Sequence, residues 1–270
     1  MAPSAAEDLE LLLSLAEPAG EIALRHFGTD LEIAEKPDDQ GPVTAADREI
    51  DRFLQDSLLG KRPDYGWLSE ETPDDPARSE RARVFIVDPI DGTRGFIEGK
   101  KGFSVVMAVA EAGRVVAAVV HLPARAETYA AAQSMGAELN GAPLTPMRRT
   151  DLSGADFLIN TSQLSPRHWP GGVPPVNRHF RPSFAWRLCL VAAGAFDGLV
   201  TFRDAWEWDI GAGCLIAQEA GAAVSDATGQ PIRFNTADRT SPGVIAAAPA
   251  IHRQLLALRK RPLVAGEGRH

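Results

Sequence analysis

The hydrophobic positions of this 270-residue chain follow a helical period in some segments and gather into short apolar runs in others. The helical spacing predicts helices over 4–27, 44–59, 184–195 and 209–220. Because proline lacks an N–H group, we expect Pro18 to kink or interrupt the first of them. The apolar runs predict strands over 84–88, 103–110, 114–121, 157–162 and 199–202. Two hairpins are expected, with Glu111-Ala112-Gly113 and Gly229 at their turns. Strands and helices alternate in the second half, which is the α/β pattern.

The most informative stretch is VFIVDPID, where an apolar β-branched run ends in acidic residues. The run predicts a strand that is buried on both faces. Pro89 keeps Asp88 out of helical geometry, so Asp88, the carbonyl of Ile90 and Asp91 lie on a constrained arc. Two carboxylates this close repel each other unless a cation lies between them, and Mg²⁺ prefers such oxygen ligands. An ordinary Asp-Pro turn at the surface is the alternative.

Gly92 and Thr93 follow this acidic stretch at a turn into a short predicted helix. Backbone N–H groups at the start of a helix attract anions, phosphate above all. The segment therefore combines a candidate cation site with a candidate phosphate site.

Three other segments contribute acidic residues, and each has an ordinary alternative. Thr44 and Asp47 have the spacing of a capping box, so Asp47 could simply cap its helix. Glu70 and Glu71 form a pair of the kind that is usually solvated. Asp209 precedes a small-residue helix and is either its N-cap or a carboxylate aimed at a shared centre.

Together these segments resemble the inositol monophosphatase superfamily, with CysQ-type 3'(2'),5'-bisphosphate nucleotidases as the nearest likeness. The resemblance rests on VTAADREID, SEE, VDPIDGT and WDIGAG, with GAELNG between the last two, and it covers nearly the whole chain. It implies a layered αβαβα sandwich of the α/β class. We expect an α+β part over 1–150 that carries most of the metal ligands, an α/β part over 151–265 that carries Asp209, and a frayed tail over 266–270.

The resemblance also implies an Mg²⁺-dependent phosphatase, often lithium-sensitive, that binds two or three ions. The implied metal ligands are Glu70, Asp88, the carbonyl of Ile90, Asp91 and Asp209. Asp47 and Thr93, with Glu70, would orient or deprotonate the attacking water, and Gly92 and Thr93 would offer N–H groups to the phosphate. Bound ions lower the pKa of water and neutralise charge on the leaving oxygen, so no protein nucleophile is needed.

The substrate is read from weaker signals. Inositol-specific relatives carry a glutamate shortly before the WD motif, and this chain has none there. The stretch Arg94 to Ile97, the residue Glu207 and the helix around Cys189 are similar to the nucleotidases instead. We therefore expect the protein to remove the 3'-phosphate of adenosine 3',5'-bisphosphate. The expected substrate-binding residues are Arg94, Thr161, Ser162 and Arg187, although each arginine could equally be a solvated surface charge. The alternatives are an inositol-1-monophosphatase or other sugar-phosphate phosphatase, and a catalytically silent regulator that binds metal or phosphate.

Composition narrows the remaining possibilities. The six histidines and two cysteines are scattered without zinc-ligand spacing, which favours an oxygen-only site. A net charge of −8 disfavours binding to nucleic acid polymers but not to a small phosphorylated substrate. The chain has no long apolar run and no signal-like start, so we expect no stable membrane association and a cytoplasmic location. A homodimer is an option, since relatives often form one.

Overall fold

The computed structural model describes residues 3–29, 31–35, 41–145 and 148–260. Its α-helices are α1 (Ala5–His26), α2 (Ala45–Lys61), α3 (Thr93–Ile97), α4 (Phe184–Ala192), α5 (Glu207–Glu219) and α6 (Pro249–Lys260). Its strands are β1 (Ile33–Glu35), β2 (Pro42–Thr44), β3 (Gly66–Ser69), β4 (Arg83–Asp91), β5 (Ser104–Glu111), β6 (Arg114–Leu122), β7 (Glu127–Ala132), β8 (Ala137–Leu139), β9 (Ala142–Pro143), β10 (Asp156–Ile159), β11 (Asn177–His179), β12 (Gly198–Thr201), β13 (Ala205–Trp206), β14 (Ala223–Ser225), β15 (Thr240–Ser241) and β16 (Val244–Ala247).

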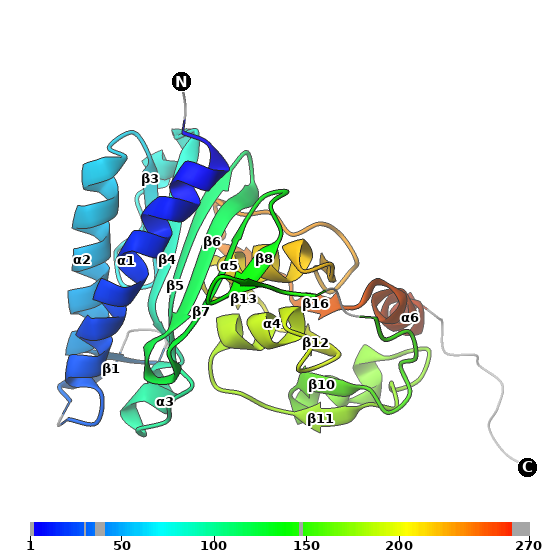
Figure 1. Ribbon diagram of the computed structural model, residues 1–270. Coiled ribbons are helices and arrows are strands. Elements are labelled where there is room, and N and C mark those ends of the chain that lie inside the picture. Colours follow the sequence, from blue (N-terminus) through cyan, green and yellow to red (C-terminus); the bar gives the residue numbers. More distant parts are fainter. Residues whose placement is uncertain (1–2, 30, 36–40, 146–147, 261–270) are drawn as a thin grey trace, which may run out of the picture.

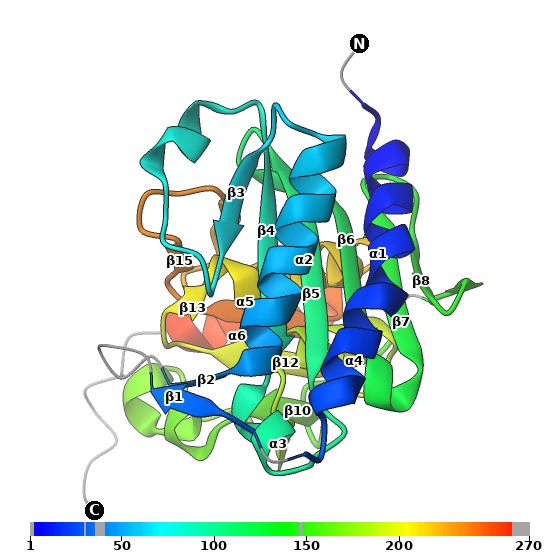
Figure 2. The ribbon, with the colours of Figure 1, turned by 90° about the vertical axis from the view of Figure 1, so that its left-hand side faces the viewer.

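Helices and sheets alternate in layers across the molecule (Figure 1). The larger sheet has the order β3-β4-β5-β6-β7-β8-β9, and the smaller one has the order β11-β10-β12-β16-β14. Helices α1 and α2 cover one face of the larger sheet, and α5 packs on the other with α4 beside it (Figure 2). Helix α4 also contacts β12 of the smaller sheet, and α6 packs against β16. This arrangement is the predicted αβαβα sandwich.

Strand β4 is buried along its whole length because it contributes to two cores. Val84 and Ile86 belong to the core shared with α4 and α5, whereas Phe85 and Val87 pack under α1 and α2. Side chains alternate between the two faces of a strand, so an unbroken apolar run suits a strand covered on both sides. A register shift between Asp88 and Asp91 interrupts the ladder with β5 and ends the strand in acidic residues.

Two helices begin beside that strand end for reasons visible in the sequence. The backbone N–H and the hydroxyl of Thr44 donate to Asp47 Oδ2 at 2.8 Å and 2.6 Å, which closes the predicted N-terminus of α2. Small residues let α5 lie close to α4: a Cβ at Gly213 would be 2.6 Å from Leu188 Cβ. Trp206 is the N-cap of α5, so Asp209 lies in its first turn instead of capping it.

Three local predictions were wrong. Helix α1 runs from Ala5 to His26 through Pro18, so the expected interruption does not occur; one face of the helix packs on the larger sheet. Helix α4 ends at Ala192, and Gly194 follows with a φ of +70°. The expected hairpin over 222–234 does not form. There Asp226 accepts bonds from the backbone of Thr228 and Gln230, and β14 pairs instead with β16.

The predicted division at residue 150 stays a prediction. The larger sheet ends at β9 and the smaller one begins with β10, yet α5 packs on the larger sheet. The predicted tail over 266–270 lies outside the described residues. Among the described helices, none combines the length and the apolar character needed to cross a membrane.

Candidate metal centre

Three acidic side chains from separate parts of the chain meet beside the end of β4. Glu70 follows β3, Asp88 lies in β4, and Asp209 lies in the first turn of α5. One carboxylate oxygen from each lies within 4.8 Å of the other two. Figure 2 shows β3 and β4 side by side near α2, which explains how two of the three come together.

Asp88 is the most deeply buried of the three. Its Oδ1 atom has no hydrogen-bond partner among the described residues. Burial raises the pKa of Asp88 well above its usual range, and repulsion by Glu70, Asp91 and Asp209 adds to the effect. A divalent cation bound to these hard oxygen ligands would remove both penalties, so the residues fit an Mg²⁺ site.

Asp91 lies next to the cluster but also holds the start of α4. Its Oδ1 accepts a bond from the N–H of Phe184 at 3.0 Å, and its Oδ2 accepts from Ser183 Oγ at 2.6 Å and from the N–H of Ala185 at 2.7 Å. Burial raises the pKa of Asp91, whereas these hydrogen bonds oppose the rise. Its carboxylate therefore joins the large sheet to the helix beyond it, and its role as a metal ligand stays a prediction.

Asp47 and Thr93 approach each other across the same region. Thr93 Oγ1 donates to the Ile90 carbonyl at 2.9 Å and lies 3.5 Å from Asp47 Oδ1. Since Asp47 Oδ2 already accepts two bonds from Thr44, its Oδ1 is the oxygen that faces Thr93. A carbonyl oxygen has two lone pairs, so the bond from Thr93 leaves the Ile90 oxygen able to bind a cation.

Gly92 makes the turn between these residues possible. Its φ is +95°, a value that glycine adopts without strain. Helix α3 begins at Thr93 and has 5 residues, so its dipole adds little to phosphate binding. Any attraction for phosphate at this turn comes from individual N–H groups and nearby cations.

A cavity of about 380 Å³ opens beside the cluster. Its lining includes Glu70, Gly92, Thr93, the exposed cations Arg94 and Lys100, Glu98, and Phe180, of which 51% is exposed. Lys100 pairs with Glu98, whereas the guanidinium of Arg94 has no ion pair within the part of the chain that the structure describes. The cavity therefore offers an aromatic ring and positive charge next to the acidic centre.

The other predicted substrate residues are divided between two places. The guanidinium of Arg187 lies 4.5 Å from the ring centroid of Phe184 and 5.5 Å from that of Phe180. Burial lowers the pKa of Arg187, whereas attraction to Asp91 and Asp209 opposes this change. Thr161 and Ser162 are exposed on a short 3-10 helix after β10, and neither lines that cavity.

Glu207 was read as a nucleotidase feature, but it has a structural role. This fully buried carboxylate accepts bonds from the N–H of Asn235 at 2.6 Å, and from the N–H and the hydroxyl of Thr236 at 2.8 Å and 2.6 Å. It fixes the loop before β15. The likeness at this position therefore carries no weight for the choice of substrate.

Three residues around the centre were missed by the sequence reasoning. Ser183 caps α4 and donates to Asp91, Asp51 bonds to both sides of the Glu70 loop, and Phe180 is the exposed ring of the cavity. Ser183 carried the ordinary signal of an N-cap serine before a helix. Asp51 lies four residues after Asp47, hence on the same face of α2. No local signal distinguishes Phe180.

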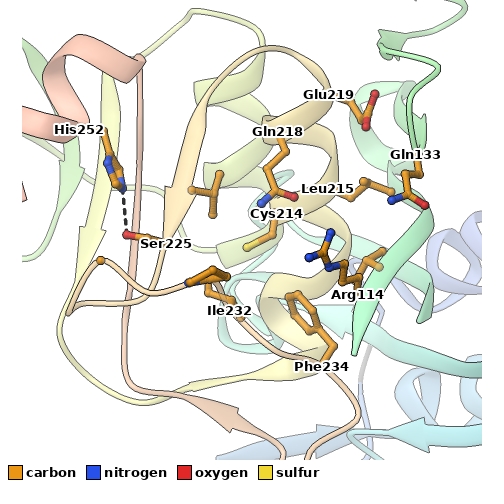
Figure 3. Close-up of a pocket in the computed structure, with 14 residues that line it drawn as sticks. Arg114, Gln133, Cys214, Leu215, Gln218, Glu219, Ser225, Ile232, Phe234 and His252 are labelled. Atoms are coloured by element: carbon orange, nitrogen blue, oxygen red, sulfur yellow. Dashed lines mark hydrogen bonds between the residues drawn. The ribbon is translucent and has the colours of Figure 1, made fainter. Parts of the chain in front are cut away.

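A second cavity, of about 440 Å³, lies beside the C-terminal half of α5 and has no such chemistry (Figure 3). His252 Nε2 contacts Ser225 Oγ at 2.9 Å there, but His252 bonds to no carboxylate within the described residues. Burial raises the pKa of the Cys214 thiol to about 12, so that thiol stays protonated at neutral pH. Neither Ser225 nor Cys214 is an activated nucleophile, and the candidate chemistry stays at the acidic centre.

Comparison with known proteins agrees with this geometry. The family model described as "Inositol monophosphatase family" matches residues 5–262. The chain belongs to the inositol monophosphatase family. The predicted superfamily is thereby confirmed, and so is the broad class of phosphatase.

Relatives in the family carry different activities in their names. An inositol-1-monophosphatase from Rhizobium meliloti is 36% identical over 82% of this chain and 86% of its own length. A histidinol-phosphatase from Chlorobaculum parvum is 33% identical over 93% of this chain and 95% of its own. The structure of an IMPase from Thermotoga maritima superposes with a TM-score of 0.79 at 28% identity, covering 93% of this chain and 96% of that one. The nearest likeness expected, to CysQ-type nucleotidases, stays a prediction.

Proposed function

We propose that this protein is an Mg²⁺-dependent phosphomonoester hydrolase whose metal ligands are Glu70, Asp88, the Ile90 carbonyl, Asp91 and Asp209. The observation that carries the proposal is that one carboxylate oxygen each from Glu70, Asp88 and Asp209 lies within 4.8 Å of the others, and that the Oδ1 atom of the buried Asp88 has no hydrogen-bond partner among the described residues. Carboxylates held this close on rigid elements are stable as anions only around a cation. With five ligands, the centre has the capacity for two or three ions.

The bound ions would supply an activated water and neutralise charge on the leaving oxygen. Asp47 and Thr93 would orient that water, and the Asp47 carboxylate, whose Oδ1 lies 3.5 Å from Thr93 Oγ1, would accept its proton. Glu70, which also lines the cavity, would assist. Gly92 and Thr93 would offer their N–H groups to the phosphate, and Arg94 in the same lining would supply a counter-charge.

For the substrate we favour a nucleoside 3',5'-bisphosphate. Arg94 and Lys100 suit a second phosphate, and Phe180 offers a ring on which a base can stack. The guanidinium of Arg187 lies over the Phe180 ring and adds positive charge beside it. Thr161 and Ser162 are outside this cavity, so we assign them to the far rim of the substrate with a minor contribution to affinity.

Inositol 1-phosphate is the second candidate, favoured by the relative of that activity at 36% identity. Against it, the position that carries a glutamate in inositol-specific relatives lies in the segment Thr201 to Ala205. There Phe202 packs on Trp169 and under Arg259, in the core of the second sheet. The segment therefore lacks that glutamate, and its exposed polar side chains are Arg203 and Asp204.

The test is phosphate release from adenosine 3',5'-bisphosphate, inositol 1-phosphate and histidinol phosphate, each with Mg²⁺ and with a chelator. We expect Mg²⁺-dependent release, highest with the bisphosphate. Replacement of Phe180 by Ala should raise KM for the nucleotide by about tenfold, the loss of one stacking contact, and leave KM for inositol 1-phosphate within twofold. Leu24, an exposed apolar residue on α1, provides the matched control Leu24→Ala. Faster turnover of inositol 1-phosphate than of the nucleotide would reverse the order of the two candidates.

A further inference from the structure

The loop that carries Glu70 is bracketed by one carboxylate from α2. Asp51 Oδ1 accepts a bond from Ser69 Oγ, just before Glu70, and Asp51 Oδ2 accepts one from Thr72 Oγ1, just after Glu71; both bonds are 2.5 Å long. The Thr72 hydroxyl in turn accepts a bond from Trp67 Nε1 at 3.2 Å. A single side chain thus ties both flanks of the acidic pair to the same point on a helix.

The bracket is anchored in rigid surroundings. Asp51 is 7% exposed and follows Ile50, which is fully buried in the core under the larger sheet. Asp51 also lies four residues after Asp47, so α2 presents both carboxylates on one face. Charge-assisted bonds of this kind are stronger than neutral ones, and here the bond from Ser69 is buried and the bond from Thr72 is partly buried.

The loop needs such a restraint. The N–H of Glu70 donates to the Val87 carbonyl at 3.3 Å, and the N–H of Glu71 reaches Ser69 Oγ at 3.4 Å, so both of these backbone bonds of the acidic pair are long. Meanwhile Asp88 and Asp209 repel the Glu70 carboxylate whenever no cation lies between them. Without a bracket, repulsion would swing Glu70 outward, and each metal-binding event would have to order the loop again.

We infer that Asp51 is a positioning residue that sets the metal affinity of the centre by holding Glu70 in place through Ser69 and Thr72. The inference rests on the proposed function, because it takes the acidic cluster to be the metal site. Partners behind the direct ligands of a metal typically contribute 10- to 100-fold to its affinity. Asp51 touches neither substrate nor metal in this arrangement, so its effect falls on affinity for the ion and not on turnover at saturating metal.

The experiment measures Mn²⁺ binding to the metal-free full-length protein by isothermal titration, alongside thermal unfolding without metal. Asp51→Ala removes both arms of the bracket and should weaken Mn²⁺ binding by about tenfold or more. Thr72→Val keeps the shape of the side chain and the charge of Asp51 but removes one arm. It should weaken binding by about threefold or more, which separates the bracket from a simple loss of negative charge.

Asp8→Ala is the matched control. Asp8 is also a buried acid in a hydrogen-bonded network, but it bonds to Arg62, Arg83 and Tyr65 at the opposite end of β4. This variant should lose thermal stability and bind Mn²⁺ within twofold of the unaltered protein. Turnover of Asp51→Ala at saturating Mg²⁺ should recover to within threefold.

Two results would overturn the inference. Mn²⁺ affinity within twofold of the unaltered protein in both Asp51→Ala and Thr72→Val would show that the bracket does not control Glu70. Absence of Mn²⁺ binding to the unaltered protein would refute the proposed function itself, and the inference with it. If Asp51→Ala fails to fold, Thr72→Val alone decides the matter.

Discussion

The sharpest energetic consequence of the acidic centre concerns Asp88→Asn. In the metal-free protein this change removes a buried charge that faces Glu70 and Asp209 within 4.8 Å. Two unit charges 4.8 Å apart repel by about 3.5 kcal/mol at an effective dielectric constant of about 20. Because the pKa of Asp88 is raised, partial protonation already relieves much of this repulsion. We therefore expect a net gain of about 1–3 kcal/mol in the free energy of unfolding.

That gain should appear as a rise in Tm. At about 2–4 °C per kcal/mol, the metal-free Asp88→Asn protein should melt roughly 2–12 °C above the unaltered one. The same change removes a metal ligand, so Mg²⁺ should no longer raise Tm, and phosphatase activity should fall by about 10³-fold or more. Differential scanning calorimetry with and without Mg²⁺ measures both effects.

Asp8→Asn is the control, because Asp8 faces cations rather than other acids. It should lower Tm while leaving the response to Mg²⁺ intact. The reasoning would be refuted if metal-free Asp88→Asn melted below the unaltered protein and Mg²⁺ still raised its Tm by the usual amount. Such a result would mean that the three carboxylates do not form a repulsive, cation-requiring cluster.

Three further changes test other parts of the structure. Asp91→Asn should abolish turnover and also cost about 1–3 kcal/mol of stability by urea unfolding, because Asp91 accepts three bonds at the start of α4; retained activity would place the site elsewhere. Burial lowers the pKa of His121 below its ordinary value of 6.5. As the pH falls below 6.5, the unfolded chain therefore binds a proton at this residue before the folded protein does, and the free energy of unfolding decreases. His121→Asn should reduce that slope by up to about 1.4 kcal/mol per pH unit in urea unfolding at pH 5.5 and 7.5, and an unchanged slope would contradict the assignment. Gly243→Ala should lower the free energy of unfolding in urea by about 2 kcal/mol or more, because φ at this position is +82° and the new Cβ would lie 2.4 Å from the Thr201 carbonyl oxygen. A decrease of less than about 0.5 kcal/mol would be inconsistent with this crowding.

Local sequence patterns were sufficient where residues that are close in the sequence determine the structure. The apolar run before Asp88 gave a strand buried on both faces, and the spacing of Thr44 and Asp47 gave the start of α2. The family motifs gave the layered fold, because their order along the chain fixes which elements are present. In the first two cases the decisive residues lie within one turn or one strand of each other.

Local sequence patterns were insufficient where contacts with distant parts of the chain determine what a residue does. The role of Asp91 as a metal ligand stays a prediction, and no local pattern indicated the three hydrogen bonds that its carboxylate accepts from Ser183, Phe184 and Ala185 at the start of α4. Glu207 was interpreted as a residue typical of nucleotidases, but in the folded structure its carboxylate accepts bonds from the N–H groups of Asn235 and Thr236 and holds their loop. A hairpin was expected over 222–234, but Asp226 accepts bonds from the backbone of Thr228 and Gln230, and β14 pairs with β16.

Metal-dependent hydrolysis itself is tested most directly by following phosphate release from adenosine 3',5'-bisphosphate, inositol 1-phosphate and histidinol phosphate as Mg²⁺ is added to the metal-free protein. Release should be at background without metal, rise with Mg²⁺ to a plateau, and be lost again with chelator. It should stay at background in Asp88→Asn at every metal concentration. Release that is independent of Mg²⁺, or no release from any of the three esters, would contradict the assignment of the acidic centre as the catalytic site.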